Sequence, residues 1–257
     1  MLNKKNIVFM IDIDLRGEGR WSSSRRTPYQ YSIKSWTKWC EKNNCELFVL
    51  NDLLMPHEAM GICWQRYYLF DILEANDIKY DQVCMVDADT IIHPECPNFF
   101  NSTDHKLCSV HNDGSYDWVI RSIENYSKYF FQGHLMPIEN YIDCGFIIVN
   151  ESHKQFFKHI TEFYHNNSDN LSNAEKAWHT GTDQTPVNFL IDHYEIDLKL
   201  FPYEYNMIDL NRKDLLTDEM LFTKIGWIYQ FNGIPNNKND ELTLYWMKRT
   251  YEELYEN

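Results

Sequence analysis

Two aspartates placed to bind a metal ion follow a short hydrophobic run in the first half of the chain. Residues 83–86 are apolar throughout, and Asp87 and Asp89 come directly after them, separated by one alanine. In an extended backbone, residues two positions apart point to the same side, so both carboxylates can converge on one point. Hard carboxylate oxygens suit Mg²⁺ or Mn²⁺ better than zinc, and such a cation would stabilise the charge of a departing diphosphate. A simple turn after a strand, which aspartate also favours, is the alternative interpretation.

Three later segments hold further polar residues beside predicted elements. Asp143 and Gly145 lie at the start of an apolar run, where glycine permits close approach of the backbone to a ligand. Thr182 or Asp183 can cap a helix that begins at the next residues. Residues 227–235 read as a strand that runs into a glycine turn with amide side chains at its end.

The hydrophobic pattern predicts the scaffold that positions these residues. Strands are expected at 7–11, 46–50, 83–86, 107–110, 146–149 and 225–231, and helices at 29–42, 61–76, 153–165, 183–194 and 240–255. Strands that alternate with helices predict an α/β fold with a mostly parallel sheet flanked by helices. Ligands of such sheets bind beyond the carboxyl ends of the strands, which is where the two aspartates fall. Residues 14–27 are expected to form a loop, and the aromatic-rich insert 114–141 has no predicted structure.

Four motifs in order resemble those of GT-A-fold glycosyltransferases: D-A-D at 87–89, D-C-G-F-I-I-V-N at 143–150, T-D-Q-T-P-V-N at 182–188 and Q-F-N-G at 230–233. The resemblance runs from about residue 7 to residue 235. It implies one GT-A-like, Rossmann-type catalytic domain over 1–257, with the donor-binding part at about 1–110 and the acceptor side and C-terminal helix at about 111–257. It also implies a metal-dependent, hexosyltransferase-like enzyme that moves a sugar from a nucleoside-diphosphate sugar to a glycan or other hydroxyl acceptor.

The resemblance further implies roles for single residues. Asp87 and Asp89 would bind Mn²⁺ or Mg²⁺ and the ribose or diphosphate of the donor. Asp143 and Gly145 would lie near the donor sugar, and Arg66 matches a basic position that often touches the donor.

Asp183 and Gln184 would lie beside the reacting carbon or the acceptor. If the reaction inverts the sugar, a carboxylate must deprotonate the acceptor hydroxyl, with Asp183 the first choice and Asp143 the second. If the configuration is retained, Gln184 would stabilise the oxocarbenium-like sugar. The sequence leaves both courses open.

One position departs from the pattern of the related enzymes. They frequently have a histidine metal ligand where this chain has Gln230. A Gln oxygen can ligate a hard cation, but less strongly than an anionic ligand. Gln230 is therefore the predicted third metal ligand, and Asn232 is the alternative.

Two charged residues outside these motifs have open assignments. Asp12 ends the first strand, which in the resembling enzymes usually faces the nucleotide base, and Lys238 could neutralise diphosphate or be an exposed loop lysine. Asp12 could also be the nucleophile of a haloacid-dehalogenase-like phosphohydrolase, but Arg16 and the lack of a late G-D-x-x-x-D motif oppose this. A GT-A-like domain that binds nucleotide or glycan without catalysis is the remaining alternative.

Composition restricts the partners and the setting. The 257 residues are 44% hydrophobic and carry a net charge of −14, which opposes a nucleic-acid partner because phosphate backbones attract basic surfaces. No apolar run approaches the roughly 20 residues that span a bilayer. The seven cysteines form no CxxC pair, and the polar N-terminus does not resemble a signal peptide. A soluble, cytoplasmic protein is expected.

Overall fold

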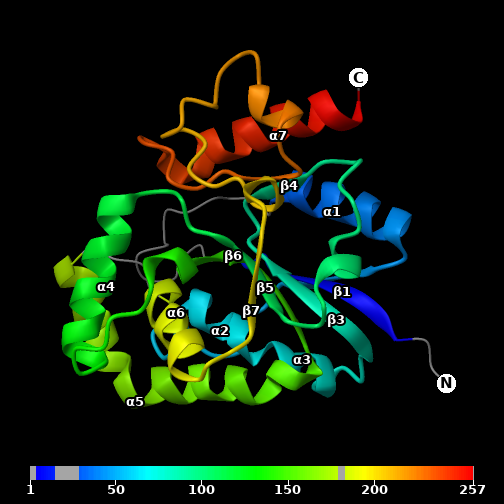
Figure 1. Cartoon of the computed structure of the whole chain (residues 1–257). Coiled ribbons are helices and arrows are strands. Elements are labelled where there is room, and N and C mark those ends of the chain that lie inside the picture. Colours follow the sequence, from blue (N-terminus) through cyan, green and yellow to red (C-terminus); the bar gives the residue numbers. More distant parts are fainter. Residues whose placement is uncertain (1–3, 15–28, 179–182, 257) are drawn as a thin grey trace.

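A six-stranded sheet forms the centre of the structure (Figure 1). The computed structural model describes residues 4–14, 29–178 and 183–256. The strands of the central sheet lie in the order β2-β1-β3-β6-β5-β7, with bounds β1 Lys5–Ile11, β2 Glu46–Leu50, β3 Tyr80–Val86, β5 Leu107–His111, β6 Ile142–Asn150 and β7 Leu198–Phe201. A second, two-stranded sheet pairs β4 Thr90–Ile92 with β8 Ile228–Gln230.

Strand β6 is antiparallel to both of its neighbours, whereas the other neighbouring pairs of the central sheet are parallel. Its first residues therefore lie at the edge where β1 and β3 end. Val86 pairs with Phe146, and the backbone N–H of Asp87 donates to the carbonyl of Gly145 over 2.9 Å. This reversal brings the D-A-D segment and the start of β6 to the same place.

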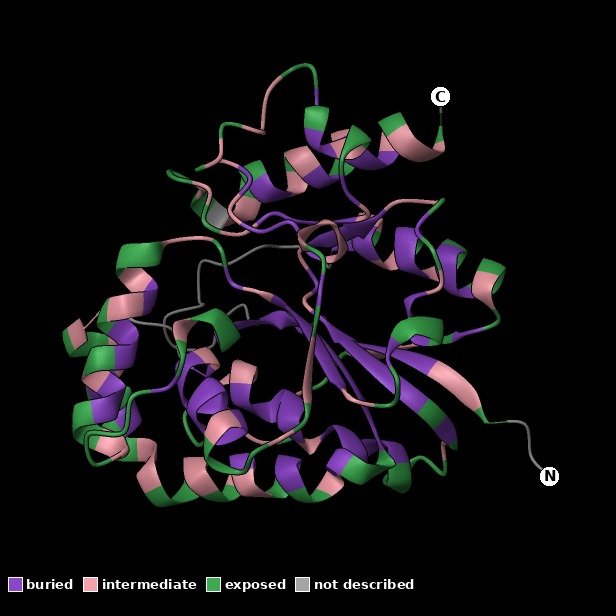
Figure 2. Cartoon of the chain, viewed as in Figure 1, coloured by how far each residue is buried: buried purple, intermediate pink, exposed green. Residues whose placement is uncertain are grey.

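The two faces of the sheet bury separate hydrophobic cores, as expected when alternate side chains of a strand point to opposite sides. Phe9 and Met85 belong to the core beneath α2 to α6, and Met10 and Val86 to the core beneath α1 and α7. Figure 2 shows the buried strands between these layers. The helices are α1 Gln30–Asn43, α2 Ile62–Gln65, α3 Leu69–Ala75, α4 Tyr116–Phe130, α5 Lys154–Trp178, α6 Gln184–His193 and α7 Glu241–Tyr255.

The mostly parallel α/β sheet flanked by helices is confirmed, with several corrections to individual elements. The predicted helix 61–76 is wrong at its middle, where a 3₁₀ turn at Arg66–Tyr68 separates α2 from α3. The predicted helix 153–165 is too short, because α5 continues to Trp178. The strand predicted at 225–231 forms only β8 and belongs to the second sheet. Strands β4 and β7 were not predicted, and the loop predicted at 14–27 lies outside the described residues except for its first residue.

The aromatic insert 114–141 contains α4, which packs its inner face against the rest of the domain. Tyr126 and Tyr141 are fully buried, whereas Tyr116 and Tyr129 are 72% and 57% exposed. The ring of Tyr129 stacks on Trp178 at the end of α5, with 4.8 Å between centroids. The aromatic residues of the insert are thus divided between the core and the exposed surface of α4.

Two expectations about the whole chain can be compared with the structure. The cysteines are all free thiols. Within residues 4–14, 29–178 and 183–256, no helix combines the length and the apolar character needed to cross a bilayer.

A buried hydroxyl fixes the backbone that follows β3. Thr90 Oγ1 donates to the carbonyl of Asp87 over 2.7 Å and accepts from the indole N–H of Trp36 over 2.9 Å. Both Thr90 and Trp36 are completely buried, so water cannot replace either bond. Helix α1 is thereby joined to the D-A-D segment.

The substitution Thr90→Val keeps the shape of the side chain and leaves both partners unpaired. Unsatisfied buried polar groups cost about 1–3 kcal/mol each, so the free energy of unfolding is expected to fall by at least about 1 kcal/mol in urea titration. Thr161→Val is the matched control, because Thr161 Oγ1 bonds to the Lys158 carbonyl at an exposed site. Equal stability of the two variants would contradict this role for Thr90.

Candidate active site

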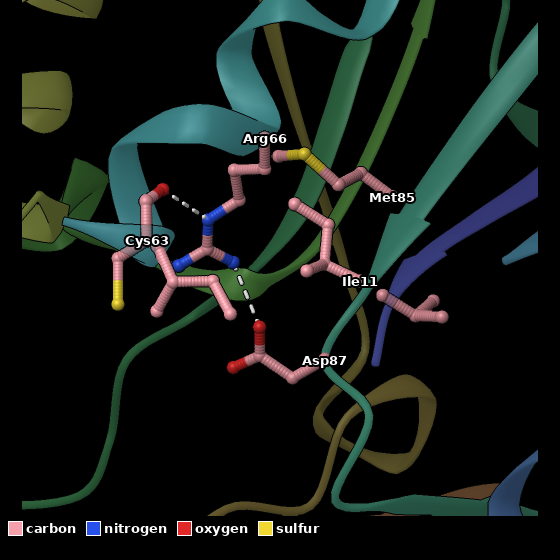
Figure 3. Close-up of a pocket in the computed structure, with 7 residues that line it drawn as sticks. Ile11, Cys63, Arg66, Met85 and Asp87 are labelled. Carbon is pink, nitrogen blue, oxygen red and sulfur yellow. Dashed lines mark hydrogen bonds and ion pairs between the residues drawn. The ribbon is translucent and has the colours of Figure 1, made fainter. Parts of the chain in front are cut away.

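A pocket opens at the carboxyl ends of β1 and β3 (Figure 3). It encloses about 110 Å³ and is lined by Ile11, Ile62, Cys63, Arg66, Met85, Val86 and Asp87. A larger pocket of about 460 Å³ between residues 57–64 and 164–176 shares Ile62 and Cys63 with it. The smaller pocket lies at the strand ends where open α/β sheets bind ligands.

Arg66 is the central cation of this region. Its Nη1 lies 2.7 Å from Asp87 Oδ1 and 3.0 Å from the carbonyl of Cys144, and its Nη2 lies 2.8 Å from Asp183 Oδ2. Only about 10% of the Arg66 side chain is exposed. Burial alone would lower the pKa of Arg66, but the carboxylates of Asp183 and Asp87 raise it well above its ordinary value. The guanidinium therefore remains charged and joins two aspartates from distant parts of the sequence.

The break between α2 and α3 explains how Arg66 reaches both carboxylates. Arg66 begins the 3₁₀ turn, and its Nε also donates to the carbonyl of Cys63 over 3.0 Å. The next residue, Tyr67, donates its hydroxyl to Asp183 Oδ2 over 2.8 Å. The predicted single helix failed here because local helix propensity says nothing of these tertiary contacts.

Gln230 lies directly beside the D-A-D segment. Strand β8 pairs Gln230 with Thr90, and the backbone N–H of Phe231 donates to the carbonyl of Asp89 over 2.9 Å. The Gln230 Nε2 then donates to Asp87 Oδ2 over 2.8 Å. The second sheet thus places Gln230, the predicted third metal ligand, beside the predicted metal site.

Asp143 occupies the start of β6 and is held by three donors. The backbone N–H of Gly145 and the amide of Asn206 donate to its Oδ1 over 2.8 and 3.1 Å. The amide of Asn112 donates to its Oδ2 over 3.0 Å. A Cβ added at Gly145 would lie 2.6 Å from Gln230 Oε1, 2.8 Å from Asp143 Oδ1 and 2.9 Å from Asp87 Oδ2. Glycine is required here because three side chains close around its Cα.

Burial and neighbouring negative charges raise the pKa values of the carboxyl groups of Asp87, Asp89 and Asp143. The pKa of Asp89 rises to about 8, through burial first and then through the charges of Asp87 and Asp143. The pKa of Asp143 rises to about 7, again mainly through burial and then through Asp87. Burial also raises the pKa of Asp87, against the opposing effect of Arg66. Each of these carboxyl groups is therefore harder to ionise than a free aspartate, and a neighbouring positive charge would favour its ionised form.

The residues predicted beside the reacting carbon join the same cluster. Asp183 immediately precedes α6 and is 4% exposed. Gln184 begins that helix, and its Oε1 accepts from the backbone N–H of Cys144 over 3.1 Å. The predicted capping role of Thr182 lies outside the described residues, and Asp183 makes no side-chain capping bond.

Three other candidates have different surroundings. Asp12 is buried at the end of β1, where its Oδ2 accepts from the backbone N–H of Tyr29 over 3.0 Å. Lys238 is exposed in a short 3₁₀ turn before α7. Asn232 Oδ1 accepts from the backbone N–H of Asp209 over 2.8 Å, so this oxygen already has a hydrogen-bond partner other than Asp87 and Asp89.

Three residues of the cluster were missed from the sequence. For Tyr67, the only feature of the sequence that pointed to the site was its position next to Arg66. Asn112 and Asn206 lie in irregular segments with no periodic pattern, and only the folded chain shows that both reach Asp143.

Asp87 and Asp89 retain oxygen positions that could accept a hard divalent cation. Asp89 Oδ1 is buried and has no hydrogen-bond partner within the described part of the chain. Each carboxylate oxygen of Asp87 accepts one bond, and a carboxylate offers about four acceptor positions in all. Gln230 fits less well, because it presents nitrogen to Asp87. In the ranges that the structure describes, no three Cys, His, Asp or Glu side chains are grouped to hold a metal.

Comparison with known proteins identifies the fold. No protein-family model and no curated protein matches the sequence. Among solved structures, a glycosyltransferase involved in the glycosylation of the major capsid of PBCV-1 matches with a TM-score of 0.59 and 9% identity, over 95% of this chain and 99% of that chain. The galactosyltransferase LgtC, solved with donor and acceptor sugar analogs, matches with a TM-score of 0.51 and 12% identity, over 97% and 94%. The chain has the GT-A glycosyltransferase fold.

Removing the Arg66 charge tests how strongly the site is built around it. Arg66→Met breaks the buried ion pair with Asp183, and breaking a buried ion pair costs about 3–5 kcal/mol. We expect a loss of this size in the free energy of unfolding, measured by denaturant titration. Arg121→Met is the control, because the Arg121–Asp117 pair spans 3.6 Å on the surface and contributes little. A fall no larger than that of the control would show that the Arg66 pairs do not hold the site together.

Proposed function

We propose that this protein is a glycosyltransferase that moves a sugar from a nucleoside-diphosphate sugar to a hydroxyl of a glycan or another acceptor. The observation that carries the proposal is the cluster of Asp87, Asp89, Asp143, Arg66 and Gln230 at the carboxyl edge of a GT-A sheet. The fold alone does not establish an activity, because one fold can host many functions. The cluster adds the chemistry that such a reaction requires.

Asp87 and Asp89 are proposed to hold Mg²⁺ or Mn²⁺ together with the diphosphate of the donor. A cation there supplies positive charge to the departing diphosphate. The protein supplies the fixed carboxylates, whose positions are set by β3, by Thr90 and by the pairing of β4 with β8. Neutral Gln230 adds no negative charge, so phosphate oxygens of the donor are proposed to complete the coordination, with affinity for the cation low in the free protein.

Arg66 and Gly145 are proposed to place the donor. Arg66 lines the pocket beside Asp87 and keeps its charge there, so it can attract the anionic part of a nucleotide sugar. Gly145 lets Asp87, Asp143 and Gln230 close around the backbone of β6, because any Cβ there would collide with their oxygens. Asp12, at the end of the adjacent strand β1, is the proposed contact to the base.

Two stereochemical courses are compatible with these positions. In an inverting reaction, Asp183 or Asp143 would accept the proton of the acceptor hydroxyl. Both carboxylates are buried and hydrogen-bonded, Asp183 to Arg66 and Tyr67 and Asp143 to amide donors. In a retaining reaction, the amide of Gln184 would stabilise the positively charged sugar. The stereochemistry of the product decides between them.

The two alternative functions have less support. A haloacid-dehalogenase-like phosphohydrolase would use Asp12 as its nucleophile, yet Asp12 Oδ2 accepts from a backbone amide in a chain with a GT-A fold. A domain that binds nucleotide or glycan without catalysis would need neither Asp183 nor Gln184 in the cluster.

Donor binding is expected to depend on the cation. A nucleoside diphosphate should raise the melting temperature in the presence of Mn²⁺ or Mg²⁺, because binding at 100 times Kd stabilises the folded state by about 2.7 kcal/mol. The uridine, guanosine, adenosine and cytidine forms are compared by thermal melting, each with Mn²⁺ and with excess EDTA. The same melts of Asp89→Asn should show little stabilisation.

Equal stabilisation in EDTA would argue against a cation that bridges protein and diphosphate. Turnover is then measured as release of nucleoside diphosphate from a panel of nucleotide sugars. Phosphate release that survives in Asp89→Asn but is lost in Asp12→Asn would favour the phosphohydrolase instead.

The close packing around Gly145 gives a second test of the proposed site. Gly145→Ala places a Cβ within 3 Å of three side-chain oxygens, so Asp87 and Gln230 must move. We expect nucleotide-sugar turnover to fall by at least about 100-fold, the loss that follows from a displacement of about 1 Å. Gly61→Ala is the control, because its Cβ would meet nothing closer than 3.9 Å. Similar turnover by both variants would remove Gly145 from the proposed site.

A further inference from the structure

Two carboxamides connect the carboxylates at either end of the cluster. Asn206 Nδ2 lies 3.1 Å from Asp143 Oδ1 and 3.2 Å from Gln230 Oε1. Gln230 Nε2 in turn lies 2.8 Å from Asp87 Oδ2. Asn206 is completely buried and Gln230 is 4% exposed, so water has little access to either amide.

The acceptors at the two ends fix the direction of both amides. Asp143 Oδ1 also accepts from the backbone N–H of Gly145, and Asp87 Oδ1 accepts from the guanidinium of Arg66, so both carboxyl groups act as acceptors. An acceptor oxygen needs a donor, so Asp143 requires the NH₂ group of Asn206 and Asp87 requires the NH₂ group of Gln230. If only the Gln230 amide turned by a half-rotation, its NH₂ group would face the NH₂ group of Asn206, and its oxygen would face an oxygen of Asp87. If both amides turned, the oxygen of Asn206 would face an oxygen of Asp143.

This arrangement has a cost at Asn206. Its Oδ1 is buried and has no hydrogen-bond partner in the part of the chain that the structure describes. An unsatisfied buried oxygen destabilises the folded state, so the orientation is maintained by the two bonds of the Asn206 NH₂ group. Gln230 is consequently held with nitrogen, which is not a ligand for a hard cation, toward Asp87.

We propose that Asn206 is a positioning residue that sets the orientation of the Gln230 amide and thereby determines how tightly Asp87 and Asp89 bind a divalent cation. While Asn206 donates to Gln230, the Gln230 oxygen faces away from Asp87 and the cation lacks a third protein ligand. Without that donor, only Asp87 holds the Gln230 amide, and a cation bound at Asp87 can turn the Gln230 oxygen toward itself. The inference rests on the cation site of the proposed function.

The test is calorimetric titration of Mn²⁺ into the full chain without nucleotide. Asn206→Leu removes the donor at similar volume and is expected to tighten Mn²⁺ binding about five-fold, the factor that corresponds to one hydrogen bond of about 1 kcal/mol. Asn206→Ala serves as a second variant that removes the same donor, should leucine prevent folding. Thermal melts establish which variants are folded.

Two controls separate positioning from a general disturbance. Asn112→Leu also removes an amide donor from Asp143, but Asn112 bonds to the other oxygen and makes no bond to Gln230, so affinity should not rise. In a Gln230→Leu background, Asn206→Leu should no longer change Mn²⁺ affinity, because no amide remains to be oriented.

The outcomes distinguish this inference from the function on which it rests. Unchanged or weaker Mn²⁺ binding by the Asn206 variants, or a gain that persists in the Gln230→Leu background, overturns the role of Asn206 alone. If no variant and no wild-type protein binds Mn²⁺, even with nucleoside diphosphate added, the cation site fails and this inference with it. A gain confined to chains that retain Gln230 supports it.

Discussion

The buried guanidinium of Arg66 is the interaction on which the arrangement of the site depends. It joins Asp87, which follows β3, to Asp183, which precedes α6, and it also binds the carbonyl of Cys144 in β6. Three elements far apart in the sequence are therefore fixed by one side chain. Because the Arg66–Asp183 pair is buried, removal of either partner leaves an uncompensated charge.

The reversed strand β6 provides the second constraint. A fully parallel sheet would place only the carboxyl ends of its strands at this edge. The antiparallel β6 instead places its first residues there, including Asp143 and Gly145, whose Cα lies close to three side chains. The small β4–β8 sheet then adds Gln230 from the other side. The backbone thus brings these side chains close together, and their positions depend less on flexible side-chain torsions.

Much of the fold could be predicted from sequence, because buried strands and amphipathic helices have strong periodic patterns. The position of Asp87 and Asp89 followed from the apolar run before them. The break at Arg66 could not be predicted, because the Trp64–Leu73 region has the spacing of one helix and the break serves contacts with distant carboxylates. Asn206 had no signal at all, since its significance arises only from the two side chains that it meets in space.

The balance of charge gives the site its chemical character. The cluster contains four aspartates (Asp87, Asp89, Asp143 and Asp183) and one arginine, and the whole chain carries a net charge of −14. An anionic diphosphate would meet repulsion from such a surface unless positive charge arrived with it. A cation held by carboxylates and phosphate together removes that repulsion for both. Because Gln230 supplies no charge and is turned with its nitrogen toward Asp87, the proposed cation site lacks one oxygen ligand from the protein, which the diphosphate of the proposed donor would provide. Under the proposed function, donor and cation would bind as one unit, and selectivity for a diphosphate would follow from this shared coordination.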